Sequence, residues 1–295
     1  MHLGHCHVPW TNAIGVGHRQ HISTSDISTR LRHTADVRRV ALVGVFVSLV
    51  AASAAPAADV TLRIIFPEGM SVRQMGDQVS AVRRIAIRTR HVTPVLTGNG
   101  YAAAAATTSP PTAFRAADKR HSIEGFLFPA GYAFGPSTRP IELIRLQLAA
   151  FARNWSRVDV GSRRPYDVLV VASMIERETV APDERKLVSA VIWNRLEKGM
   201  PLGIDATLRY GLGIQGTRPI TATEQRNPTP YNTNLHTGLP PTPIGNPGLP
   251  SMIAAARPAA VDYLYYVRKP DHVHHFFTAS EAEFCAKAKE YGYHC

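Results

Sequence analysis

An apolar run near the N-terminus most constrains how this chain can fold. Residues 40–58 carry no charge and directly follow Arg38 and Arg39. The run just reaches the length needed to span a bilayer, and basic flanks stay on the cytoplasmic side. Its strongly apolar part is short, however, and the Ala-Pro-Ala at 55–57 would suit a signal-peptide cleavage site. A retained anchor and a cleaved signal both remain open, with a buried soluble helix as the less favoured third alternative.

The residues before this run form a polar, histidine-rich segment, 1–37, that we expect to be a cytoplasmic tail. Four of its side chains could bind a metal ion: His2, His5, Cys6 and His7. They lack the complete, spaced ligand set of a zinc site, so we expect no metal and no other cofactor.

The amino-acid composition limits the classes of partner that the protein can bind. A length of 295 residues with 45% hydrophobic content supports a substantial core, and the net charge of +11 favours anionic surroundings. Nucleic acid, an anionic membrane surface and a cell-wall polymer all fit that charge. The sequence has no zinc-finger, RNP or helix-turn-helix signature, so we expect no nucleic-acid partner. Cys285 and Cys295 would lie on the oxidising side, where a disulfide between them is allowed.

A small αβ module is predicted over residues 59–118. β-Branched residues and alternation over 60–66 predict a strand, and Ser71 is placed to cap a following helix. Residues 97–120 are rich in Gly, Ala, Thr and Pro, which indicates a linker or a degraded part of the module.

A larger α+β domain is predicted from residue 119 to 295. Helices are expected over 139–155, from Pro165, from Pro182 to Gly199, and at the C-terminal end. A long loop is expected over 202–220. Two strands, 262–269 and 274–279, should pair before the last helix.

One predicted helix ends in an unusual way. The stretch DVLVVASMIERETV, 167–180, places Glu176 and Glu178 at the end of an apolar run. On a helix these two side chains lie ~200° apart, and periodicity does not choose between them. A buried carboxyl group has a raised pKa and can donate a proton near neutral pH. Alternatively, both glutamates pair with Arg177, Arg185 or solvent at the helix end.

Two further segments carry side chains suited to binding. Residues 231–248 combine Tyr231 and Asn232 with several Gly and Pro residues, which suits an N-acetyl sugar or a purely structural loop. The histidines of HVHHFF, 272–277, could ligate a metal, but a histidine and aromatic cluster at a strand edge is the preferred interpretation.

The motifs also resemble a known family in their order. EGFLFPAGY, ASMIERET, VIWNRLEKGMPLGIDATLRYGLG, YNTNLHTGLPPTPIGNPG and YLYYV follow one another as in the MltG/YceG-like endolytic murein transglycosylases. The resemblance covers most of residues 119–295, and the preceding FPEGMSV is similar to that family's LysM-like subdomain.

The resemblance implies a lyase that cuts peptidoglycan strands internally between MurNAc and GlcNAc, leaving 1,6-anhydro-MurNAc ends during cell-wall assembly. Glu176 matches the family's catalytic glutamate. The matched motifs imply further residues that line the cleft: Glu124, Asn194, Asp205, Tyr231 and Asn232. One carboxylate can suffice because the sugar's own C6 hydroxyl is the nucleophile, at high effective molarity.

The same resemblance implies a single-pass protein of the plasma membrane with an extracytoplasmic catalytic domain, and peptidoglycan synthases as partners. The chain departs from the family pattern at Ala130 and Gly131, at Ala206 and at Phe284. Two other functions therefore compete: a non-catalytic peptidoglycan-binding or scaffold protein, and a metal-dependent hydrolase. The hydrolase would use histidines from this set: His236, His272, His274 and His275.

Overall fold

The structure is a computed structural model that describes residues 60–115, 122–216 and 218–294. The predicted tail, 1–37, and the predicted membrane segment, 38–58, lie outside these residues. From residue 60 onward the chain belongs to one compact unit.

Within the described ranges, no helix has both the length and the apolar character needed to cross a membrane.

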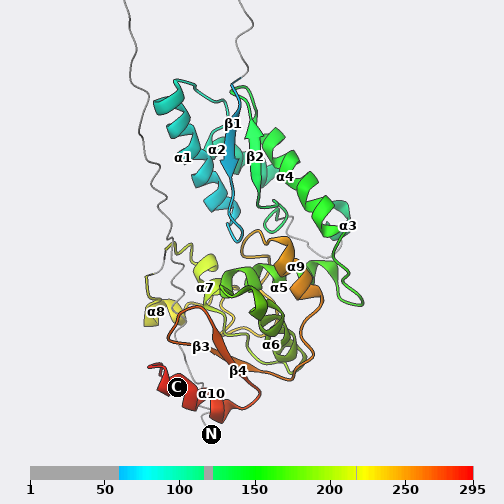
Figure 1. The fold of residues 1–295 in the computed structure, drawn as a ribbon, viewed down its shortest axis with the longest axis vertical. Helices are drawn as coiled ribbons and strands as arrows, with labels where there is room; N and C mark the ends of the chain where they lie inside the picture. The colour runs from blue at the N-terminus through cyan, green and yellow to red at the C-terminus, as the bar shows by residue number, and fades with distance from the viewer. Residues whose placement is uncertain (1–59, 116–121, 217, 295) are drawn as a thin grey trace, which may run out of the picture. The chain divides into compact units, whose positions relative to one another are not determined.

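The first elements follow the predicted strand, turn and helix (Figure 1). Strand β1, Leu62–Ile65, alternates buried and exposed side chains. Helix α1, Val72–Arg90, begins after Ser71, whose hydroxyl accepts from the N–H of Gln74 in a capping box. β1 pairs antiparallel with β2, Gly131–Phe134, which comes from beyond residue 119. Elements from both predicted domains thus share one small sheet, and the division at residue 118 stays a prediction.

Of the two interpretations of residues 97–120, the linker is wrong for the first half, and a part of the module stays the open alternative. Residues Gly98–Thr107 form helix α2, capped by the Thr97 hydroxyl, and Thr112–Arg115 form α3. A Cβ on Gly98 would collide with the carbonyl oxygen of Gly76, so the absence of a side chain lets α2 lie directly on α1. The Gly-Ala composition therefore serves close packing between helices.

The buried Tyr101 fastens α2 to the next helix. Its hydroxyl donates to Gln147 Oε1 over 2.6 Å, on α4, Pro140–Trp155, which agrees with the helix expected over 139–155.

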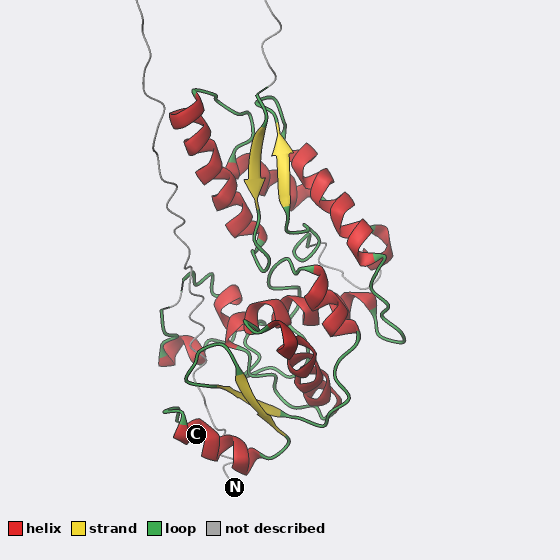
Figure 2. Ribbon diagram, in the orientation of Figure 1, coloured by secondary structure: helices red, strands yellow, loops and turns green. Residues whose placement is uncertain are grey.

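The predicted apolar helix is α5, Pro165–Glu178, and it lies in the interior. It packs against α6, Arg185–Glu197, and α9, Leu249–Ala256 (Figure 2). A short 3-10 turn, η1, Pro182–Glu184, leads into α6.

The long loop expected over 202–220 is interrupted by helix α7, Asp205–Gly211, so that prediction is wrong there. Its Ala206, Thr207 and Leu208 are buried, which shows that tertiary packing favours a short helix among the surrounding glycines. Helix α8, Ala222–Gln225, follows.

The C-terminal region matches its prediction. β3, Tyr265–Arg268, pairs antiparallel with β4, His275–Thr278, and α10, Glu281–Glu290, packs on both. Cys285 on α10 is disulfide-bonded, and its partner lies outside the described residues. The fold class is therefore α+β, as expected.

Candidate functional site

Glu176 lies in the last turn of α5 and is almost enclosed. Its Oε2 accepts from the backbone N–H of Gly248 over 2.9 Å, and its Oε1 lies 4.0 Å from Arg185 Nη2. Only 6% of the Glu176 side chain is exposed. A backbone donor and one cation therefore fix the direction of this carboxyl group.

The turn between β1 and α1 covers Glu176. Gly69, at φ +79°, is so close that a Cβ there would lie 3.4 Å from Glu176 Cγ. The turn is fastened on both sides, because Gly69 N–H donates to the Asn246 oxygen (2.8 Å) and Arg177 Nη1 donates to the Gly69 oxygen (3.1 Å). Because the backbone at Gly69 is left-handed, glycine is the favoured residue at this position.

The same turn brings a second carboxyl group to the site. Glu68 is exposed as a residue, but its carboxylate lies against Gly248, in space that any side chain at position 248 would need. Partial burial and then the charge of Glu176 raise the pKa of Glu68, while Arg185 lowers it. Glu68 is not among the site residues that the sequence predicted. In the sequence, Glu68 is marked only by the glycine that follows it in the turn.

Glu178 lies on the other side of α5. It is 1% exposed, and its Oε2 accepts from the Tyr266 hydroxyl over 3.4 Å on β3. Its backbone oxygen accepts from Arg268 over 3.5 Å. The two glutamates thus diverge as helical spacing requires, and Glu178 is enclosed beneath the β3–β4 hairpin.

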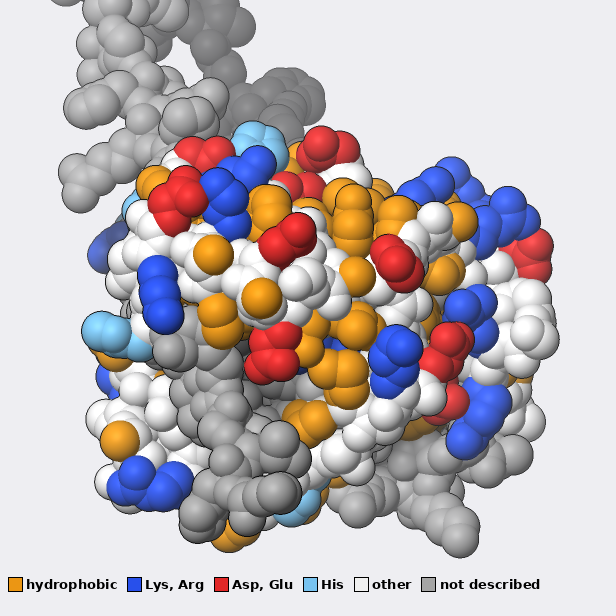
Figure 3. All heavy atoms as spheres, turned by 90° about the horizontal axis from the view of Figure 1, so that it is seen from below, with side chains coloured by type: hydrophobic (Ala, Val, Ile, Leu, Met, Phe, Trp, Pro, Cys, Tyr) orange, Lys and Arg blue, Asp and Glu red, His pale blue; other side chains and the backbone are white. Residues whose placement is uncertain are grey.

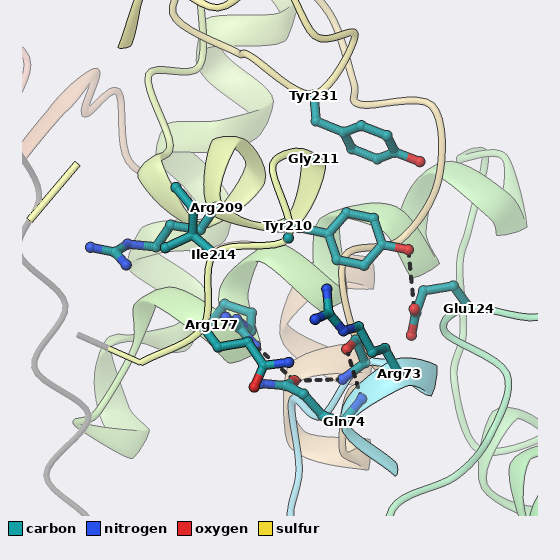
Figure 4. A pocket seen from close by; sticks show the side chains of 12 residues that line it. Arg73, Gln74, Glu124, Arg177, Arg209, Tyr210, Gly211, Ile214 and Tyr231 are labelled. Carbon is teal, nitrogen blue, oxygen red and sulfur yellow. Dashed lines mark hydrogen bonds between the residues drawn. The ribbon is translucent and has the colours of Figure 1, made fainter. Parts of the chain in front are cut away.

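A cavity of about 280 Å³ lies beside the start of α1 and the end of α5 (Figure 4). Its lining comprises Ser71, Arg73, Gln74, Glu124, Arg177, Arg209, Tyr210, Gly211, Gly213, Ile214, Gln215 and Tyr231. Two of the sequence-predicted residues, Glu124 and Tyr231, therefore come together here. Glu176 does not line this cavity, although its neighbour Arg177 does.

Glu124 is buried at the cavity wall and accepts hydrogen bonds from three residues. Val72 N–H lies 3.0 and 3.2 Å from its two oxygens, Asn246 Nδ2 lies 3.0 Å from Oε1, and the Tyr210 hydroxyl lies 3.1 Å from Oε2. Burial raises the pKa of Glu124 to about 7, although these donors and Arg177 act in the opposite direction. A carboxyl group of this kind can hold a proton near neutral pH.

The aromatic wall of the cavity is a pair of tyrosines. The rings of Tyr210 and Tyr231 meet edge to face with centroids 5.0 Å apart, and the Tyr231 hydroxyl lies 2.8 Å from that of Thr242. Arg209 is buried, and its Nε has no partner among the described residues. In Figure 4 the Arg209 side chain points away from Glu124.

The other predicted cleft residues do not line this cavity. Asn194 Nδ2 donates to the backbone oxygens of Val261 and Tyr263, each over 2.9 Å. Asn232 is fully buried, and its Nδ2 donates to the backbone oxygens of Gln225 and Asn227. Asp205 is buried at the start of α7. Substrate contact by these three residues stays a prediction.

The histidines considered for a metal site have other neighbours. His275 is buried, with Nδ1 2.6 Å from Glu184 Oε2, and the exposed His274 lies 2.9 Å from Asp271. Among the described residues, no group of three or more His, Cys, Asp or Glu side chains is placed to hold a metal ion.

Comparison with known proteins shows the family of this chain. The model of the YceG-like family matches residues 42–290, and the chain belongs to that family. It is 36% identical over 155 residues to an endolytic murein transglycosylase of Bacillus subtilis (strain 168) and 32% identical over 156 residues to one of Streptococcus pneumoniae (strain D39).

These matches cover 51% and 50% of this chain but only 43% and 28% of the two relatives, so the matched part is less than half of each. The structure is also similar to the crystal structure of a YceG-like protein from Listeria monocytogenes. That similarity has a TM-score of 0.61 at 27% identity, and it covers 75% of this chain and 74% of the other.

Proposed function

We propose that this protein is an endolytic lytic transglycosylase of peptidoglycan, with Glu176 as its single catalytic acid and base. The observation that carries the proposal is the setting of Glu176: a carboxyl group at the end of a buried helix, oriented by Gly248 N–H and faced by Arg185. Membership of the YceG-like family and the names of the two relatives support it.

The reaction needs one proton donor that later accepts a proton. Glu176 gives its proton to the glycosidic oxygen as the bond from that oxygen to C1 of MurNAc breaks. The carboxylate then takes the proton of the C6 hydroxyl as O6 bonds to C1. No water is consumed, and Glu176 ends protonated as it began. Glu124, Asn194, Asp205, Tyr231 and Asn232 are proposed to line the cleft, and no metal or cofactor takes part.

The test is Glu176→Gln in the full chain, incubated with purified sacculi. Because Gln keeps the shape but cannot donate the proton, activity should fall by ~10²–10⁴-fold. Mass spectrometry should show wild-type products that are one water lighter than hydrolysed sugar.

Glu178→Gln is the matched control from the same motif. Its carboxyl group faces Tyr266, so we expect a lower melting temperature with the same products and much smaller loss of rate. Reducing-end products from the wild type would instead indicate a hydrolase. Glu68, whose carboxylate lies against Gly248 and feels the charge of Glu176, would then be the first candidate for a second carboxylate.

Glu124 is a second candidate for the general acid of the same reaction. Glu124 lines the cavity, and burial raises its pKa to about 7, which suits a general acid. The two assignments separate cleanly: an inactive Glu124→Gln beside an active Glu176→Gln would move the acid to Glu124. Wild-type protein that binds sacculi without cutting them would favour the scaffold function.

We further propose the arrangement that the sequence predicted. It comprises a tail (1–37), a retained anchor (38–58), a LysM-like module with its linker (59–118) and a catalytic domain (119–295) facing outward from the plasma membrane, near peptidoglycan synthases. Fractionation of the tagged protein tests this arrangement, because a soluble secreted form beginning near residue 58 would rule out the anchor.

A further inference from the structure

The cavity beside Glu124 carries a clear excess of positive charge. Three of its lining side chains are arginines, Arg73, Arg177 and Arg209, against the single carboxyl group of Glu124. Arginine binds carboxylates through paired, charge-assisted hydrogen bonds. A carboxylate is therefore the kind of group that this cavity should attract.

Most of the charged groups in the cavity already have protein partners. Glu124 accepts from Val72, Asn246 and Tyr210, which occupy both of its oxygens. Arg177 donates to the Gly69 oxygen and lies 3.4 Å from Gln74 Oε1. These contacts build the wall and hold its charges in place.

Arg73 differs from both of them. It lies in the first turn of α1, it is exposed, and within the described residues its guanidinium has no hydrogen-bond or ion-pair partner. A Cβ on Gly213 would lie 2.9 Å from Arg73 Nη1, so the side chain reaches across to the opposite wall. Figure 4 shows it extending toward Tyr210.

The size of the cavity limits its occupant. At about 280 Å³ it lies just below the range of ligand pockets, roughly 300–1,000 Å³, so it suits a side group and not a disaccharide. Peptidoglycan has such a side group, because short peptides with free carboxylates substitute alternate sugars. The rings of Tyr210 and Tyr231 offer an apolar wall for a peptide.

We propose that this cavity binds a free carboxylate of the peptide stem of peptidoglycan, and that the Arg73 guanidinium binds this carboxylate directly. The inference rests on the proposed function for its substrate class. It assigns the cavity to the peptide and leaves the glycan to the region of Glu176. The enzyme should then prefer strands that carry stems with free carboxylates over amidated or bare strands.

The experiment measures binding by calorimetry to the full chain. Three probes are used: the MurNAc-containing disaccharide with a tripeptide bearing free carboxylates, the same compound with those carboxylates amidated, and the bare disaccharide. Because a hydrogen bond to a charged group contributes about 1.5–3 kcal/mol, amidation should weaken binding roughly tenfold or more. Arg73→Gln should weaken binding of the probe with free carboxylates by the same factor as amidation does. In this variant, amidation of the probe should then have no further effect.

Arg84→Gln is the matched control, because Arg84 is an exposed arginine on the same helix outside the cavity lining. It should leave the affinities for all three probes unchanged. Equal affinity for the amidated and free forms would overturn the proposal. Tight, Arg73-dependent binding of the bare probe would also overturn it, because the occupant would then be the lactyl carboxylate of the sugar.

The readout is independent of catalysis. If sacculi are not cut but the Arg73-dependent preference is found, the proposed activity fails and the carboxylate site stands. If sacculi are cut and no preference is found, the carboxylate site fails and the activity stands.

Discussion

Three separate parts of the chain meet at Glu176. Helix α5 supplies the side chain, the loop before α9 supplies the Gly248 donor, and the turn after β1 covers it through Gly69. Each contact uses backbone or a residue without a side chain, so small changes in these glycines should be felt at the site.

Gly245→Ala tests the close approach of this loop and turn. A Cβ at Gly245 would lie 2.5 Å from the Gly69 oxygen, a backbone atom that cannot swing aside. We expect a loss of about 1–3 kcal/mol in the free energy of unfolding and a clear loss of activity, because the turn over Glu176 must shift. Gly135→Ala is the control, since its Cβ would meet only ordinary contact at 4.0 Å. Equal melting temperatures for the two variants would contradict this expectation.

Glu124 makes stability depend on pH. Burial raises its pKa in the folded protein to about 7 from the ordinary 4.5, so between these pH values the unfolded chain releases a proton that the folded chain keeps. Stability from this group is therefore complete below pH ~4.5 and declines as pH rises toward ~7, by about 3 kcal/mol. Denaturation from pH 4.5 to 8 should show this decline in the wild type and a smaller one in Glu124→Gln. Parallel curves for the two proteins would refute it.

At the scale of elements, a buried pair joins η1 to the β3–β4 hairpin. Glu184 Oε1 accepts a hydrogen bond from the backbone N–H of His275 over 2.8 Å, and Glu184 Oε2 lies 2.6 Å from Nδ1 of the same residue. The His275 side chain is fully buried. Asp271 and His274 form a similar pair in the same hairpin, but both are about half exposed.

Removing the two carboxylates should therefore have unequal effects. Glu184→Ala leaves buried groups of His275 without partners, which costs roughly 1–3 kcal/mol. Asp271→Ala removes an exposed pair, which contributes roughly 0–1 kcal/mol. Thermal or chemical denaturation of both variants measures the difference. A larger loss for Asp271→Ala would show that the hairpin is fastened elsewhere.

At the scale of the whole molecule, the distribution of charge can be followed on one face. On the face seen from below in Figure 3, acidic and basic side chains are interspersed with apolar ones. This face therefore carries no large basic patch, although the full sequence has a net charge of +11.

The disulfide of Cys285 tests the predicted topology. If residues beyond 58 lie outside the membrane, Cys285 should be joined to Cys295, because Cys6 would lie in the cytoplasm. Non-reducing peptide mapping by mass spectrometry should recover the Cys285–Cys295 pair. A pair between Cys6 and Cys285 would contradict the retained anchor, since both ends would share one compartment.

Local patterns in the sequence determined the elements that carry their own signals. Ser71 marked the start of α1, Pro165 that of α5, and two short runs rich in aromatic residues marked β3 and β4. The ordered motifs also indicated the YceG-like family, which the comparison confirms. These features are local in the chain, so capping, proline placement and side-chain alternation suffice to predict them.

Only the tertiary structure decided which residues share a site. Helix α2 forms in a Gly-Ala stretch because α1 accepts it without a Cβ at Gly98, and that fit involves a distant segment. Helical spacing separated Glu176 from Glu178, but only the placement of Gly248 and Tyr266 set their surroundings. Glu68 lies near Glu176, and Arg73 lines the same cavity as Glu124, although the members of each pair are more than 50 residues apart in the sequence. Such long-range neighbours depend on how the elements pack, which no local pattern in the sequence specifies.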